Sequence, residues 1–144
     1  MSVEITLAYE GELRCSAEHG PSGVRLHTDA PVDNCGKGES FSPTDLVATA
    51  LGACVLTILG IQAQKHNLDL TGTTVHVEKH MAAAPLRRIA KLPVHVHLSV
   101  PLSPRFQALF QRAAATCPVH QSLREDIERP INFHWKSDDS SELP

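Results

Sequence analysis

The sequence predicts an α+β domain in which antiparallel strands are wrapped around one long buried helix. Two observations lead to this fold class. The stretch 42–67 (SPTDLVATALGACVLTILGIQAQKHN) is apolar on every face, which is typical of a helix surrounded by protein. Stretches with the alternation of strands lie before and after it, without the regular βαβ order of a parallel sheet. We therefore expect the 144 residues to form a single domain, 1–144.

The N-terminal part is predicted to form a meander of three strands. Residues 3–9 (VEITLAY) alternate, Glu10-Gly11 makes a turn, and 13–17 returns as a second strand. A short third strand follows at 24–27. The stretch from there to the central helix, DAPVDNCGKGESF, is rich in Gly, Pro, Asp and Asn and is expected to be a loop. Long loops in compact domains are often functional.

The central helix has a well-marked start. Ser42 can accept a hydrogen bond from a free backbone N–H, Pro43 suits the first helical position, and Asp45 places a carboxylate in the positive first turn. We expect the helix to run from Pro43 to about His66. Its apolar run, 46–61, is shorter than the about 20 residues that a membrane crossing needs. We therefore predict a buried helix of a soluble protein.

The remaining elements follow from the same signals. Residues 73–81 (TTVHVEKHM) and 91–100 (KLPVHVHLSV) are expected to pair as a hairpin across the APLRR connection. Ser103-Pro104 then starts a second helix that ends near Thr116. Cys117-Pro118 looks like another helix start.

A last strand is expected at 131–135 (INFHW), before a polar tail, 137–144, that we expect to be frayed.

The charge argues against nucleic acid as a partner, and the N-terminal sequence argues against secretion. The formal net charge is −3, and no basic stripe marks a nucleic-acid surface. The N-terminus, MSVEITLAYEG, lacks the basic start and apolar core of a signal peptide, so we expect a cytoplasmic protein. Its four cysteines are then interpreted as reduced thiols.

Cys54 and Cys117 are the residues most suited to chemistry. Cys54 lies in the middle of the apolar helix, and Cys117 lies where a helix N-terminus could favour its thiolate. For a lone cysteine in an apolar helix, packing as a small hydrophobe is the commoner role, so position alone does not decide. Cys15 and Cys35 are interpreted as incidental.

The nine histidines raise the possibility of a metal site. His95 and His97 share one face of their strand, as do His76, Glu78 and His80 on theirs. Alternating polar residues are usually the solvated face of an antiparallel sheet, and no CxxC or HExxH spacing is present. We predict no metal.

Read together, these features resemble a known family. The run GKGESFSPTDLVATALGACVLTILGIQA, followed by CPVHQSL at Cys117, is similar to the OsmC/Ohr family of thiol peroxidases and osmotically induced proteins. The similarity covers nearly the whole chain, including the N-terminal strands and the hairpin. It implies an intertwined homodimer in which N-terminal strands complete the partner's sheet.

The resemblance also implies a mechanism. Cys54 attacks a hydroperoxide as thiolate, Cys117 resolves the product as a disulfide, and a dithiol reduces it, with no metal, haem or flavin. In the family an arginine held by a loop glutamate compensates the thiolate. Glu39 fits the glutamate and Arg14 is the preferred arginine, with Arg25, Arg87 and Arg88 as the other candidates.

Two other functions stay open at this stage. The turn at Tyr9-Glu10-Gly11 departs from the Gly-Arg-Asp-Gly-like turn of the Ohr branch, which motivates a non-enzymatic, stress-linked protein that binds an apolar small molecule at the dimer interface. A thiol-dependent hydrolase using Cys54 with His120 has only the residue types in its favour. In the CPVH segment His120 could stabilise a thiolate or simply cap the helix.

Overall fold

The structure is a computed structural model in which residues 1–138 are described, so the predicted frayed tail, 137–144, lies largely outside the described residues. The chain divides into two compact units, one ending at Val47 and the other beginning at Ala48. Each unit is described by itself below. The assignment of 1–144 to a single domain stays a prediction.

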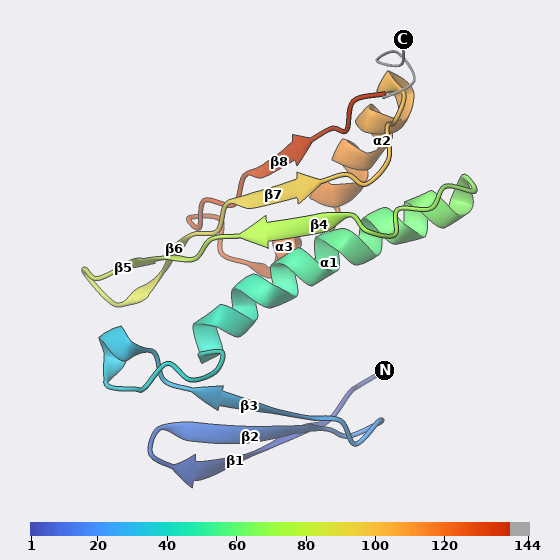
Figure 1. Cartoon of the computed structure of the whole chain (residues 1–144). Coiled ribbons are helices and arrows are strands. Elements are labelled where there is room, and N and C mark those ends of the chain that lie inside the picture. Colours follow the sequence, from blue (N-terminus) through green and yellow to red (C-terminus); the bar gives the residue numbers. More distant parts are fainter. Residues whose placement is uncertain (139–144) are drawn as a thin grey trace. The chain divides into compact units, whose positions relative to one another are not determined.

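The N-terminal unit is an antiparallel sheet of three strands, as predicted. Strand β1 (Ile5–Gly11) pairs with β2 (Arg14–His19), which pairs with β3 (Arg25–Asp29). Figure 1 shows this meander at the blue end of the chain. The loop that follows contains one short 3₁₀ helix, η1 (Val32–Asn34).

Backbone pairing divides the N-terminal sheet into an apolar and a charged face. Leu7 lies opposite Ala17, which lies opposite Leu26, so the three share one face. Arg14 lies opposite Asp29 on the other face. The charged face is therefore where the first candidate site forms.

Helix α1 (Pro43–Lys65) begins as the sequence predicts. The Ser42 hydroxyl accepts the Asp45 backbone N–H at 3.1 Å, and the Asp45 carboxylate accepts the Ser42 N–H at 2.9 Å. This reciprocal pair satisfies two donors at the helix start. The helix buries a single stripe with the spacing of one helical face, made up of Ala48, Leu51, Gly52, Val55, Leu59 and Ala63.

Gly52 explains how closely α1 packs on the second sheet. A Cβ at this position would lie 3.0 Å from Val77 Cγ2 and 3.2 Å from Val75 Cγ1. Even a methyl group there would press on these two valine side chains of strand β4 (Thr74–Val77), which would have to move by a few tenths of an ångström. Glycine thus lets the helix turn that carries Cys54 approach the sheet.

The predicted hairpin is confirmed, but it is divided into two pieces. Strand β4 pairs with β7 (Val94–His97), while β5 (His80–Ala82) pairs with β6 (Arg88–Lys91). Pro93 lies at the break between β6 and β7, where it has no N–H to donate and its carbonyl accepts the Glu78 N–H at 3.2 Å.

The last strand joins the second sheet in parallel. Helix α2 (Pro104–Ala115) and the short helix α3 (Pro118–Ser122) connect β7 to β8 (Ile131–His134). This helical connection returns the chain to the end of the sheet at which β7 begins, so β8 runs parallel to β7. The strand order is β4-β7-β8.

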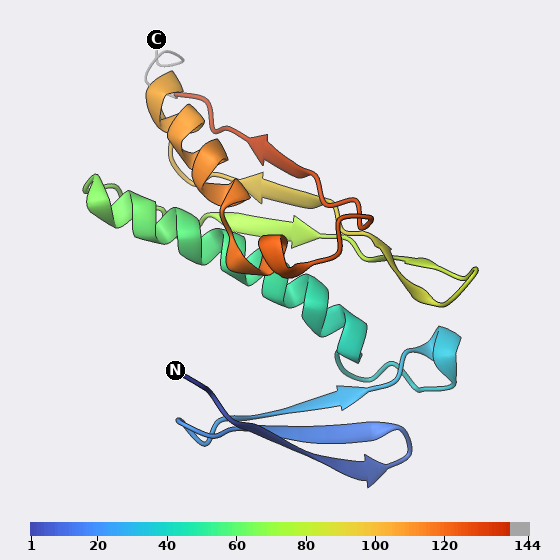
Figure 2. The same cartoon turned by 180° about the vertical axis from the view of Figure 1, so that it is seen from behind.

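Helices cover one face of this second sheet. Figure 1 views the strands from the open side, and Figure 2 shows α1, α2 and α3 in front of the same strands. The core lies between them and includes Val55, Leu59, Val94, Val96 and Phe110, all without exposed surface. The predicted α+β class with antiparallel pairing is confirmed, with the parallel β8 as an addition.

By length and composition alone, α1 is the one helix in residues 1–138 that could cross a membrane. The helix has 23 residues and is therefore longer than the apolar run 46–61 that it contains. The buried stripe nevertheless packs on strands of the second unit, which is typical of the core helix of a soluble protein. We therefore describe α1 as a core helix.

Candidate functional site

The second unit brings the two predicted thiols together. Cys54 lies in α1, two residues after Gly52, and Cys117 is the N-cap residue of α3. The two thiols interact, since Cys54 contributes to the pKa shift of Cys117, and both are free thiols. Cys54 is half-buried, whereas Cys117 is 0% exposed. Of the pair, only Cys54 therefore has surface exposed to solvent.

The surroundings of Cys117 keep its proton in place. Burial first, and then the neighbouring Cys54 thiol, raises the pKa of the Cys117 thiol above its ordinary value of 9.0. The backbone N–H groups of His120 and Val119 act in the opposite direction but do not reverse the shift. Cys117 is thus a thiol at neutral pH.

Two helix ends fix the position of Cys117. Its N–H donates to Ala114 at the end of α2, and its carbonyl accepts the Gln121 N–H at 3.0 Å in α3. The His120 N–H donates to the Cys117 sulfur at 3.5 Å, which is the N-cap role that the Cys-Pro sequence predicts. The thiol is therefore held at a defined junction.

His120 contacts this junction through its backbone. Within the described residues its Nδ1 is buried without a hydrogen-bond partner, and burial, followed by the charge of Arg129, lowers its pKa. Arg129, which sequence reasoning missed, donates to the carbonyls of His120, Arg124 and Ile127. The helix cap is Cys117, which accepts the His120 backbone N–H, and whether the His120 ring stabilises a thiolate stays a prediction.

The N-terminal unit forms a separate charged site. Arg14 Nη2 donates to Glu39 Oε2 at 2.5 Å and lies 3.6 Å from Asp29 Oδ2. The Glu39 N–H also donates to Asp29 Oδ2 at 3.0 Å. Asp29 therefore anchors both the arginine and the loop that carries Glu39.

The two carboxylates differ strongly in burial. The Glu39 side chain is 60% exposed and that of Asp29 is 2% exposed. The hydrogen bond and charge of Glu39 raise the pKa of Arg14 above its ordinary value, so the guanidinium stays cationic. Sequence reasoning missed Asp29, and only its place at the end of a strand before the loop could have indicated it.

This site encloses a pocket of about 200 Å³ that combines charged and polar side chains, lined by Glu10, Arg14, His27, Thr28, Asp29, Glu39 and Ser40. Asp29 Oδ1 and Arg14 Nε are buried there without hydrogen-bond partners among the described residues. The pocket can therefore accept one more donor and one more acceptor.

The other sequence candidates lie elsewhere. Among the four predicted arginines, Arg14 is the partner of Glu39, while Arg25 pairs with Glu18 at 3.0 Å and Arg88 lies 3.9 Å from Asp126. Cys15 is half-buried and Cys35 is exposed, and both are free thiols.

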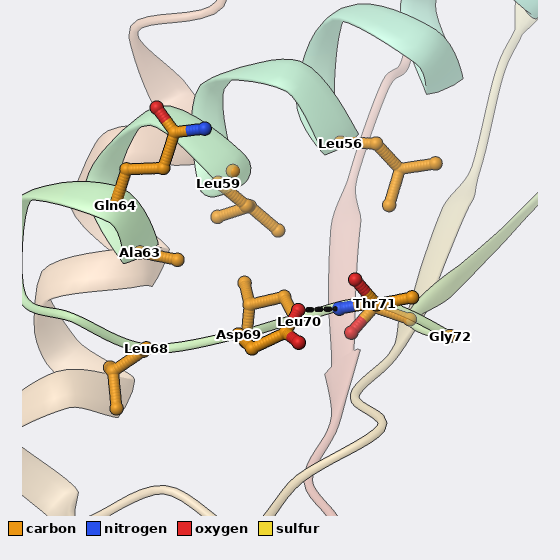
Figure 3. Close-up of a pocket in the computed structure, with 11 residues that line it drawn as sticks. Leu56, Leu59, Ala63, Gln64, Leu68, Asp69, Leu70, Thr71 and Gly72 are labelled. Carbon is orange, nitrogen blue, oxygen red and sulfur yellow. Dashed lines mark hydrogen bonds between the residues drawn. The ribbon is translucent and has the colours of Figure 1, made fainter.

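A second pocket, of about 330 Å³, lies between the C-terminal half of α1 and the segment 68–73. Figure 3 shows Leu56, Leu59 and Leu70 on its walls. Asp69 accepts the Thr71 N–H at 2.9 Å. The Thr71 side chain first, and this backbone hydrogen bond second, lower the pKa of the Asp69 carboxyl. The pocket thus combines an apolar wall with one anionic group.

Solved structures share this fold over almost the whole chain. A candidate osmotic stress induced and detoxification response protein from Psychrobacter arcticus is 45% identical, with a TM-score of 0.85, covering 93% of this chain and 96% of that one. An organic hydroperoxide resistance protein OsmC from Legionella pneumophila is 18% identical, with a TM-score of 0.74, covering 92% and 96%. An OsmC like protein from Mycoplasma pneumoniae is 16% identical, with a TM-score of 0.78, covering 93% and 96%.

No curated protein sequence matches this chain. A family model described as OsmC-like protein matches residues 36–131, which include the loop glutamate, the central helix and both candidate thiols. With the 45% identical structure, this match covers the elements from which the resemblance was inferred. The chain belongs to the OsmC/Ohr family.

Proposed function

We propose that this protein is a thiol-dependent peroxidase that reduces organic hydroperoxides or hydrogen peroxide, with Cys54 as peroxidatic and Cys117 as resolving cysteine. The observation that carries the proposal is the asymmetry of the thiol pair. Cys54 is half-buried, whereas Cys117 is fully buried and has a pKa that burial and the neighbouring Cys54 raise, which keeps it in the thiol form. The fold is shared with organic hydroperoxide resistance proteins from Legionella pneumophila and Elizabethkingia anophelis, which supports the substrate class.

The chemistry balances with these two side chains. The Cys54 thiolate attacks the distal oxygen of ROOH, the O–O bond breaks, and the alkoxide leaves as ROH after taking up a proton. The resulting sulfenic acid is attacked by the Cys117 sulfur, which forms a disulfide and releases water. An external dithiol then reduces the disulfide and restores both thiols. No metal, haem or flavin takes part.

In this proposal Arg14 and Glu39 keep the roles that the resemblance implies. Arg14 is a permanent cation held by Glu39 and Asp29. A fixed guanidinium lowers the cost of forming a thiolate in an apolar setting. Its pairing with Glu39 supports Arg14 over Arg25 and Arg88, which pair with Glu18 and Asp126.

We also propose that the protein acts in the cytoplasm as an intertwined homodimer in defence against oxidative or osmotic stress. The homodimer is supported by the apolar side chains that one chain leaves exposed. Ile5, Leu7 and Tyr9 alternate along one face of β1 and are each more than half exposed. The family resemblance implies that the sheet of a partner chain covers these side chains.

Peroxide consumption in the presence of dithiothreitol tests the activity. The wild type should consume cumene hydroperoxide, and Cys54→Ser should lower the rate by about 10³-fold or more, because no other group replaces the nucleophile. Cys35→Ser is the matched control, since Cys35 is exposed and lies outside the thiol pair. Unchanged turnover in Cys54→Ser would rule out the proposal.

The pocket of Figure 3 favours one alternative function, a non-enzymatic protein that binds an apolar small molecule. Its volume of about 330 Å³ lies in the range of small-molecule sites, and its leucine-rich wall is typical of them. A binding protein of this kind should not lose thiol groups when peroxide is added. Stoichiometric thiol loss with peroxide, reversed by a dithiol, therefore separates the two functions.

A further inference from the structure

The open face of the second sheet carries a row of four histidines from three neighbouring strands. His76 lies on β4, His95 and His97 on β7, and His134 on β8. The pairing places His76 opposite His95 and His97 opposite His134. On each strand these positions are more exposed than the residues that alternate with them, which include the buried Val94 and Val96, so the imidazoles lie on the face of the sheet opposite to the core. The helices cover the core face (Figures 1 and 2).

The four rings contact one another. His95 Nδ1 lies 3.0 Å from His134 Nε2, and the centroid of the His134 ring lies 4.4 Å from that of His97 in a stacked arrangement. The centroids of His76 and His95 are 6.5 Å apart. Within the described residues none of the four forms an ion pair with a carboxylate. No carboxylate therefore competes for the ring nitrogens of these four residues in the part of the chain described.

We infer that His95 and His134 bind a divalent first-row transition-metal ion such as Ni²⁺ or Cu²⁺. Neutral imidazole is a preferred ligand of both ions. Metal–nitrogen bonds of about 2.1 Å at right angles, as in octahedral or square-planar coordination, place two nitrogens about 3.0 Å apart. This equals the separation of His95 Nδ1 and His134 Nε2.

Metal binding at this pair uses the tautomers in which both facing nitrogens carry a lone pair. In the metal-free protein the two facing nitrogens share one hydrogen bond. A neutral imidazole carries its proton on either ring nitrogen, so a change of tautomer leaves both facing lone pairs free. In residues 1–138 no three His, Cys, Asp or Glu side chains already converge on one metal position. His97 would therefore supply a third nitrogen only after its ring rotates. Water molecules would complete the coordination.

This inference revises the prediction of no metal. The alternation of the hairpin histidines predicts a solvated face, and the sequence pattern does not show that His134 lies beside them. Only the parallel pairing of β8 with β7 brings that ring to His95. The histidine row lies on the face away from α1, which carries Cys54, so it does not depend on the proposed peroxidase activity.

Calorimetric titration of the full chain with NiCl₂ tests the site. We expect one ion per chain in the wild type, and affinity at least about tenfold weaker in His95→Ala and in His134→Ala, because each removes a direct ligand. His97→Ala should have a smaller effect. His80→Ala is the matched control, since His80 is exposed, lies 3.7 Å from Glu78 and is outside the row.

Two further variants make the result decisive. The double variant Cys54→Ser/Cys117→Ser should keep the affinity of the wild type, because thiolates could otherwise bind Ni²⁺. His134→Gln serves as a second variant, and far-UV circular dichroism confirms that each protein is folded. Absence of binding by the wild type, wild-type affinity in folded His134→Ala and His134→Gln, or loss of binding in the cysteine double variant overturns the inference.

Discussion

The two units of this chain bury different kinds of side chain. Every buried hydrophobic residue lies at position 48 or beyond, in the unit that contains the thiol pair. The buried residues before position 48 are polar, namely Thr28, Asp29 and Ser42. The N-terminal unit nevertheless forms a regular three-stranded sheet with one apolar and one charged face.

The two units therefore differ in what stabilises them. The second unit has a core of its own between helices and sheet. The N-terminal sheet exposes large apolar side chains on β1 and is stabilised internally by the ion pairs around Asp29. A small sheet with an uncovered apolar face gains little from burial, so it depends on covering that face with other protein. This dependence supports the proposed homodimer.

The largest expected effect comes from placing a charge on the apolar face of β1. Leu7 is 61% exposed in one chain, and Leu7→Lys should weaken dimerisation by about 100-fold, because the lost burial and the buried charge together cost about 3 kcal/mol. Size-exclusion chromatography with light scattering measures the dissociation. Leu86→Lys is the control, since Leu86 is 75% exposed at the hairpin connection of the other unit.

If both proteins stay dimeric to the same concentration, β1 does not contribute to the interface. A monomeric wild type of 15.6 kDa would contradict the homodimer itself.

A smaller effect is expected within the charged site. Asp29→Asn should lower the melting temperature by roughly 4–8 °C, because it removes the buried charge that anchors Arg14. Glu39→Gln should lower it by no more than about 2 °C, because exposed ion pairs contribute little even at short distance. Differential scanning calorimetry measures both, and a reversed order would show that the exposed glutamate is the main anchor.

The smallest effect concerns His120 in the second unit. Burial and the charge of Arg129 lower its folded-state pKa below the ordinary value of 6.5. As pH falls, the unfolded chain takes up this proton first, so stability declines from above pH 6.5 down through the folded-state pKa. Urea unfolding on both sides of pH 6.5 should show a smaller decline in His120→Asn than in the wild type. Equal declines would exclude His120 as a contributor.

Local sequence signals predicted most of the elements. Ser42-Pro43 and Ser103-Pro104 mark helix starts that the structure confirms at Pro43 and Pro104, and alternation located the strands. The division of the hairpin at Pro93 and the parallel register of β8 were not predicted. Both depend on which strand pairs with which, and a local pattern carries no information about pairing partners.

The candidate site was predictable to a different degree. The pairing of Arg14 with Glu39 and the proximity of Cys54 to Cys117 agree with expectations drawn from the family resemblance. The part played by Asp29 could not be predicted, because an aspartate before a loop is ordinarily a solvated turn residue. Its burial arises from packing beside Arg14 and the Glu39 backbone, which only the folded unit brings together.

Intact-mass analysis before and after one equivalent of cumene hydroperoxide tests the central claim most directly. The account predicts loss of two hydrogens in the wild type, an oxygen adduct in Cys117→Ser and no change in Cys54→Ser, because the accessible thiol reacts first and the buried thiol resolves it. An unchanged mass in the wild type, or an oxygen adduct that persists in Cys54→Ser, would contradict the two-cysteine cycle and favour the binding function.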